Sequence, residues 1–105
     1  MKAIWIRSDE RTITEVDYAG LEDMKKLIGG WLELAKAWPD GDVLYVDEEG
    51  KVKGRKTFFT VPGVHDFLAG NGVVVGPEIG DSLETAPPRI TVEQLLMQVR
   101  FGEFG

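Results

Sequence analysis

The chain of 105 residues contains no cysteine and a single histidine. Disulfide bonds, thiolate metal sites and a cysteine nucleophile are therefore excluded. A structural zinc site uses four nitrogen or sulfur ligands, so none is expected here. The sequence also lacks an apolar run of about eighteen residues, as a membrane helix needs, and an apolar signal segment at its start. We expect a cytoplasmic protein that holds no metal and no cofactor.

Positive charge is also scarce. Twelve Lys and Arg residues stand against 18 Asp and Glu residues, which gives a formal charge of −6 at pH 7. Proteins that bind nucleic acid directly need a basic face, so this class is not expected, and a basic or cationic partner is favoured. The simpler interpretation is that this acidity only maintains solubility.

Short apolar segments separated by turn residues run through the chain. They predict one α+β domain over residues 1–105, in which two helices pack on a small, mainly antiparallel sheet of about five strands. Its centre is Val43–Val46, a β-branched and aromatic run that follows the turn Pro39–Gly41. Strands are expected at 2–7, 12–18, 31–38, 43–46, 55–61 and 73–75, and helices at 21–28 and from Thr91 to a stop at Gly102.

Residues 31–38 fit two structures. A helix would gather both tryptophans of the segment with Leu34 and Ala35 on one face, whereas a strand would align Leu32, Leu34 and Trp38. We favour the strand, because the double glycine before this segment ends the preceding helix and a hairpin turn follows directly.

The clearest helix begins at Thr91, whose spacing to Gln94 is that of a capping box. Its apolar side chains recur at positions i, i+3, i+4 and i+7, a stripe that would dock on the sheet. Before it, residues 64–69 predict a single helical turn and residues 78–88 predict a surface loop.

Aromatic residues are expected to lie mainly in the core. Trp5, Trp31 and Trp38 could stack on a base or another ring, but aromatic side chains of a small sheet more often fill its interior. Phe101 and Phe104 are expected to fold back onto the core, with a partner's groove as the alternative.

Acidic residues gather in one stretch that contains Asp40, Asp42, Asp47, Glu48 and Glu49. The EF-hand pattern is absent, and a hairpin spreads these oxygens instead of wrapping them around Ca²⁺ or Mg²⁺. We interpret the stretch as a solvated hairpin tip and, if it has a function, as a face that binds a partner protein.

The basic cluster follows directly, with Lys51, Lys53, Arg55 and Lys56. On a strand, the first three would share one face and could hold the phosphate of a small ligand. They could equally protect a sheet edge from aggregation. Asn71, in a glycine-flanked turn that lacks the phosphate-loop pattern, is a further candidate ligand contact.

An enzymatic alternative would rest on His65 and nearby acids such as Asp66. A serine nucleophile would have to be Ser8 or Ser82, and neither lies in a Gly-x-Ser-x-Gly motif. Adjacent residues in a turn seldom orient each other, so a loop histidine without a catalytic role is the simpler interpretation.

Three motifs, at residues 1–4 (MKAI), 44–54 (LYVDEEGKVKG) and 68–76 (LAGNGVVVG), carry a family resemblance. With its opening hairpin, its Asp/Glu-Gly turn before a lysine and its Gly-x-Gly-Val strand, the chain resembles a family of small proteins of bacteriophages, plasmids and other mobile elements. No reaction is assigned to that family. The chain departs from relatives that carry a proline–asparagine segment where residues 55–59 (RKTFF) stand.

The resemblance implies a non-enzymatic accessory protein that inhibits a host defence system by binding. It would block a defence protein through the acidic residues 40–49, or sequester a nucleotide signal through the basic residues 51–56, the latter in a homo-oligomer. The alternatives are a small hydrolase or transferase that uses His65, and an acidic inhibitor that mimics DNA.

Overall fold

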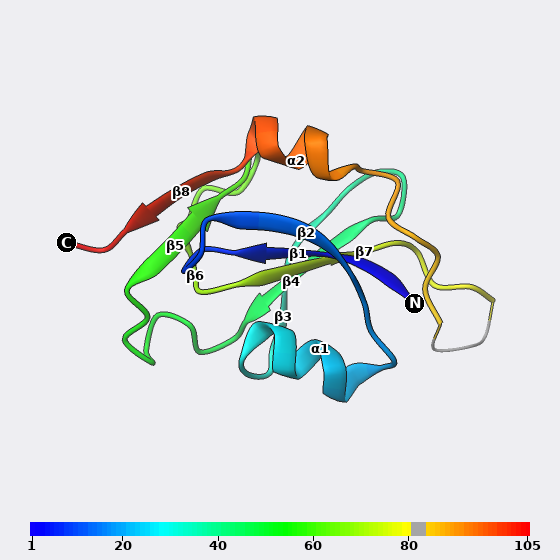
Figure 1. Cartoon of the computed structure of the whole chain (residues 1–105), viewed down its shortest axis with the longest axis horizontal. Coiled ribbons are helices and arrows are strands. Elements are labelled where there is room, and N and C mark those ends of the chain that lie inside the picture. Colours follow the sequence, from blue (N-terminus) through cyan, green and yellow to red (C-terminus); the bar gives the residue numbers. More distant parts are fainter. Residues whose placement is uncertain (81–83) are drawn as a thin grey trace.

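The computed structural model describes residues 1–80 and 84–105. Ser82 and the middle of the expected 78–88 loop lie outside the described residues. Figure 1 shows the elements along the chain. Their bounds are β1 (Lys2–Arg7), β2 (Thr12–Asp17), α1 (Leu21–Ile28), β3 (Leu32–Ala37), β4 (Val43–Asp47), β5 (Thr57–Thr60), β6 (Leu68–Ala69), β7 (Gly72–Val75), α2 (Val92–Gln98) and β8 (Arg100–Glu103).

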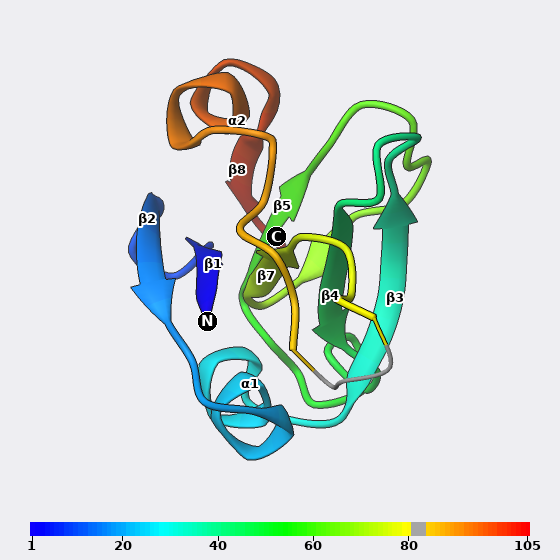
Figure 2. The same cartoon turned by 90° about the vertical axis from the view of Figure 1, so that its right-hand side faces the viewer.

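The larger sheet has five antiparallel strands in the order β2-β1-β7-β4-β3. Its central strand, β7, joins the hairpin β1–β2 to the hairpin β3–β4, and all four of its residues are buried. Figure 2 shows these strands side by side, with α1 and α2 on opposite sides. The α+β class and the mainly antiparallel five-stranded sheet are therefore confirmed. A second, smaller sheet of order β6-β5-β8 was not predicted.

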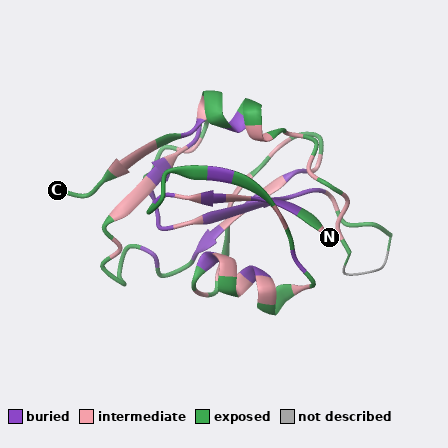
Figure 3. Ribbon diagram, in the orientation of Figure 1, coloured by how far each residue is buried: buried purple, intermediate pink, exposed green. Residues whose placement is uncertain are grey.

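Strand alternation gives the larger sheet two apolar faces. Ile4 and Ile6 of β1 point to one face, while Ala3 and Trp5 point to the other. Buried residues are concentrated in the central strands (Figure 3). The first face forms the α2-side core, made by Ile4, Ile6, Ile13, Leu44, Val46, Phe59, Val61, Leu68, Val74, Leu95 and Val99. The second forms the smaller α1-side core, made by Ala3, Tyr18, Met24, Ile28, Val73 and Val75.

The structure decides the ambiguous segment 31–38 in favour of the strand β3. It also confirms the capping box of α2: Thr91 Oγ1 accepts the Gln94 N–H at 3.1 Å, and Gln94 Oε1 accepts the Thr91 N–H at 2.9 Å. Trp31 contradicts the expectation of a core position, because it is 63% exposed, with Lys25 Nζ 3.7 Å from its ring centroid.

Three other predictions were wrong. Residues 51–54 form turns and no strand, so Lys51 and Lys53 do not share a strand face. Residues 64–69 contain no helical turn; the chain there is irregular, bends at Asp66 and ends in β6. Gly102 does not end α2, because the helix stops at Gln98 and Gly102 belongs to β8.

The two C-terminal phenylalanines, Phe101 and Phe104, differ in their burial. Phe101 is half-buried and packs against the α2-side core, as expected. Phe104 is 40% exposed and lies against Phe58 on the smaller sheet, with ring centroids 4.8 Å apart.

Candidate functional site

A groove of about 770 Å³ lies beside α1 on the α1-side face of the larger sheet. Its floor is the sheet, one wall is the start of α1, and another is the segment around Pro77 and Thr85. The lining is mostly apolar and includes two tyrosines. It consists of Met1, Tyr18, Ala19, Gly20, Leu21, Met24, Leu32, Gly41, Val43, Tyr45, Val75, Gly76, Pro77, Glu78, Glu84 and Thr85.

The groove has a small number of polar groups. The hydroxyls of Tyr18 and Thr85 hydrogen-bond to each other, and the Thr85 N–H donates to Met1 Sδ at 3.2 Å. Tyr45 is half-buried in the floor. Glu78 and Glu84 are exposed and make this side of the groove acidic. Hydroxyl groups, apolar walls and an acidic rim suit a ligand that is largely apolar and carries no negative charge.

The start of α1 borders the groove. The N-cap residue is Gly20, which offers no side chain to the free N–H groups of the first turn. Asp23 Oδ2 instead accepts the Ala19 N–H at 2.7 Å, just outside the helix. This end of α1 is therefore held by fewer hydrogen bonds than its other end.

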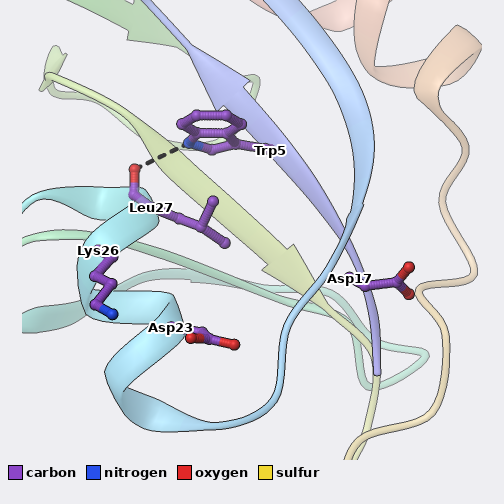
Figure 4. Close-up of a pocket in the computed structure, with 5 residues that line it drawn as sticks. All are labelled: Trp5, Asp17, Asp23, Lys26 and Leu27. Atoms are coloured by element: carbon purple, nitrogen blue, oxygen red, sulfur yellow. Dashed lines mark hydrogen bonds between the residues drawn. The ribbon is translucent and has the colours of Figure 1, made fainter.

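A smaller hollow of about 250 Å³ lies on the other side of α1 (Figure 4). Trp5 donates its indole N–H to Leu27 O at 2.9 Å. The Arg7 guanidinium carbon lies 4.6 Å from the ring centroid. Asp17 and Asp23 stand at the rim, but both already have partners, Lys2 for the former and the Ala19 N–H for the latter. The larger groove is the better candidate site.

The acidic stretch does not form one face. Asp40 and Asp42 precede β4, whereas Asp47 ends it, so the two groups are roughly 15 Å apart along the strand. Asp40, Glu48 and Glu49 are exposed. Asp42 and Asp47 are buried, with 0% and 5% exposure, so they contribute little to a partner-binding surface.

Asp42 holds the segment that leads into α2. Its carboxylate accepts the Arg89 N–H at 3.0 Å from each oxygen and the Ile90 N–H at 2.8 Å. A buried carboxylate is stable when such hydrogen bonds replace its water. Asp42 therefore joins the turn between β3 and β4 to the start of α2.

Asp47 forms ion pairs with two of the predicted ligand-binding residues. Its Oδ2 lies 2.9 Å from both Lys53 Nζ and Arg55 Nη2. The same two cations donate to Gly29 O at the end of α1, at 3.1 Å and 3.2 Å. We call Asp47, Lys53, Arg55 and the Gly29 carbonyl the Asp47 network. It places positive charge at the C-terminus of α1, where the helix dipole favours it.

The network also changes the acidity of its carboxyl group. Burial raises the pKa of Asp47, but hydrogen bonds from the Glu49 N–H, Lys53 and Arg55 outweigh burial and leave it below its ordinary value. A hydrogen bond from Lys51 likewise lowers the pKa of the exposed Asp66. Lys51, Lys53 and Arg55 are thus already paired with acids.

The remaining predicted residues lie apart from the groove. Asn71 Oδ1 accepts the Ser8 N–H at 3.1 Å, which braces the start of β7. Ser8 is buried, and its hydroxyl hydrogen-bonds to Thr57 Oγ1 at 2.7 Å and to Gly70 O. His65 and Lys56 are exposed in connecting segments. No group of three or more potential metal ligands occurs within residues 1–80 and 84–105.

A family model described as a domain of unknown function, DUF3846, matches residues 1–99. The chain belongs to this family. A search of curated proteins and a search of solved structures found no match. In the part of the chain that the structure describes, no helix is long and apolar enough to cross a membrane.

The DUF3846 match covers every residue that lines the groove and the whole Asp47 network, but it ends before β8. Sequence reasoning missed the groove, because its lining comes from six separate segments of the DUF3846 chain. Gly20, placed directly before a helix without a capping side chain, was the one local sign of an open helix end.

Proposed function

We propose that this DUF3846 protein acts by binding, without catalysis, and that its ligand occupies the groove beside α1. The groove itself carries the proposal. Its volume of about 770 Å³ lies within the range of pockets for small molecules, roughly 300–1,000 Å³. Mostly apolar walls with a few hydroxyl groups are typical of such pockets.

The expected ligand is a neutral or cationic molecule with an apolar ring. Tyr45 and Met24 offer it apolar surface, and the hydroxyls of Tyr18 and Thr85 offer it hydrogen bonds. Glu78 and Glu84 on the rim would repel a phosphate or carboxylate. The electrostatics of the groove therefore favour a different ligand class from a nucleotide.

Nucleotide capture by residues 51–56 has less support. A phosphate would have to displace the Asp47 carboxylate from Lys53 and Arg55, at a cost in stability. Inhibition of a host defence system remains a prediction from the family resemblance. Such inhibition could proceed through a small ligand of the groove. It could equally proceed through a partner protein that inserts a cationic side chain with an apolar part into the groove.

The test is a binding screen with three sets of aromatic fragments, neutral, cationic and anionic, followed by saturation-transfer NMR. We expect the neutral and cationic sets to bind and the anionic set not to bind. Val43→Trp should abolish binding, because Val43 is half-buried in the lining of the groove and an indole would fill it. Val52→Trp is the matched control, since Val52 is 81% exposed in a turn outside the groove.

Binding measurements on variants distinguish this proposal from its alternatives. His65→Ala should leave fragment binding unchanged, since His65 does not line the groove. Equal loss in Val43→Trp and Val52→Trp would locate binding elsewhere. A preference for anionic fragments, lost in a Lys53→Glu/Arg55→Glu variant that still folds, would restore the nucleotide hypothesis and contradict ours.

A further inference from the structure

The smaller sheet ends in an edge strand whose outer side pairs with no strand among the described residues. β8 is paired with β5 on one side only. Edge strands are commonly protected by charged side chains, above all lysine, by proline or by a bulge. The edge strand β3 of the larger sheet has a bulge between Leu34 and Lys36, but the sequence of β8, Arg100-Phe101-Gly102-Glu103, has neither lysine nor proline.

The pairing with β5 fixes which backbone groups of β8 are free. The Phe104 N–H donates to Lys56 O at 2.9 Å, and Gly102 also pairs with a residue of β5. Backbone groups of alternate residues point to opposite sides of a strand. Phe101 and Glu103 therefore direct their N–H and C=O groups away from β5, where a further strand would bind them.

One face of the same sheet carries exposed aromatic rings. The Phe58 ring centroid lies 4.5 Å from that of Phe67 and 4.8 Å from that of Phe104. Phe67 is 51% exposed and Phe104 is 40% exposed. Phe58 also covers Gly102, since a Cβ at this position would lie 2.4 Å from the ring. The aromatic cluster thus reaches the free edge.

We propose that β8 is a self-association surface, on which β8 of a second copy of this chain pairs antiparallel with Gly102 opposite Gly102. In this register Phe101 of each copy exchanges hydrogen bonds with Glu103 of the other, because these residues hold the free backbone groups. Arg100 of each copy lies opposite Phe104 of the other, an arrangement suited to a cation–π contact.

Self-complementarity identifies the partner as a second copy. Residues 100–104 of each copy supply both the cation, Arg100, and the ring, Phe104, of the cross-strand pairs, and glycine stands where the two backbones cross. Although the chain carries a charge of −6, β8 itself has one Arg and one Glu and is locally neutral. Five residues, 100–104, make a short interface, so we expect a dissociation constant on the order of 100 μM.

Cysteine cross-linking tests the register, because the chain has no cysteine of its own. In the double variant Arg100→Cys/Phe104→Cys, the two thiols of one copy are roughly 13 Å apart along the strand and cannot pair. Across the proposed interface they form non-hydrogen-bonded pairs, about 4.5 Å apart at Cα. We expect a disulfide-linked dimer to form at least about tenfold faster than from the control Met97→Cys, whose site is 85% exposed on α2.

Sedimentation of the cysteine-free chain tests the hydrogen bonds. Glu103→Pro removes an outward N–H from each copy and none that the monomer uses, so the fold should persist while association weakens about tenfold or more. Glu103→Ala, which keeps the N–H, should associate nearly as the natural chain does. Equal association of the proline variant and the natural chain, or cross-linking no faster than in Met97→Cys, would overturn the proposal.

Discussion

Leu95 of α2 and Met24 of α1 face opposite sides of the same sheet, but their surroundings differ. Leu95 is fully buried in the α2-side core, the cluster that also contains Phe59 of the smaller sheet. Met24 belongs to the smaller α1-side core and lines the groove. One face of the sheet is therefore closed by packing, and the other is left open where a ligand could bind.

The two helices are also held differently. α2 begins at a complete capping box, and Asp42 binds the segment in front of it. α1 is tied at its C-terminal end by the Asp47 network, whereas its N-terminal end has Gly20 as its cap and borders the groove. Stability is concentrated away from the candidate site, a common relation between binding sites and the rest of a fold.

The largest expected difference between the faces comes from removing one side chain on each. Leu95→Ala should lower the free energy of unfolding by about 3 kcal/mol, since it leaves a closed cavity in addition to losing apolar contacts. Met24→Ala should cost only about 1–2 kcal/mol, since the lost volume merges with the groove and no closed cavity forms. Urea denaturation of both variants measures the difference. Equal losses would mean that the α1-side core is packed as tightly as the α2-side core.

Replacing the Asp47 carboxylate by a neutral amide should have the next largest effect on stability. Asp47→Asn should destabilise the protein by about 2 kcal/mol at pH 7, because Lys53 and Arg55 lose their shared carboxylate. The pKa of Asp47 is lower in the folded than in the unfolded chain. Its stabilisation is therefore complete above the unfolded pKa, about 3.9, and is lost as pH falls through the folded value.

Urea denaturation at pH 7, 5 and just below 4 checks this dependence. The gap in stability between Asp47→Asn and the natural chain should be constant from pH 7 to 5 and narrow at the lowest pH. Asp66→Asn is the matched control, since the pKa of Asp66 is also lowered but its pair with Lys51 is exposed. A gap that grows as pH falls would contradict the role assigned to Asp47.

Local patterns predicted most elements, and long-range contacts explain the failures. Alternation revealed β1 and β2, the double glycine ended α1, and the Thr91–Gln94 spacing began α2. Residues 51–54 have strand-like alternation but form turns, since Lys53 is drawn to Asp47 and the end of α1. β8 is four residues long and contains Gly102, and only its pairing with β5 makes it a strand.

The candidate site was less predictable than the fold for the same reason. Lys53, Arg55 and Asp47 are charged residues of a kind that often binds ligands, and sequence reasoning chose them on that basis. Their partners are one another, a pairing visible only after the chain between them has folded. The groove depends on residues such as Tyr45 and Val43, which have no chemical distinction in the sequence.

The smallest expected effect concerns the weakly capped start of α1. Gly20 has an extended φ of 166°, and a Cβ there would meet no atom within 4 Å, so serine fits without strain. Gly20→Ser should raise the free energy of unfolding by about 0.5 kcal/mol, because its hydroxyl can accept an N–H of the first turn and the unfolded chain loses freedom. Thr91→Gly at α2 should instead lower the free energy of unfolding, since it removes the hydroxyl that accepts the Gln94 N–H. If both variants lower stability in urea, the start of α1 is already satisfied by other contacts, and the contrast between the two helices does not extend to their caps.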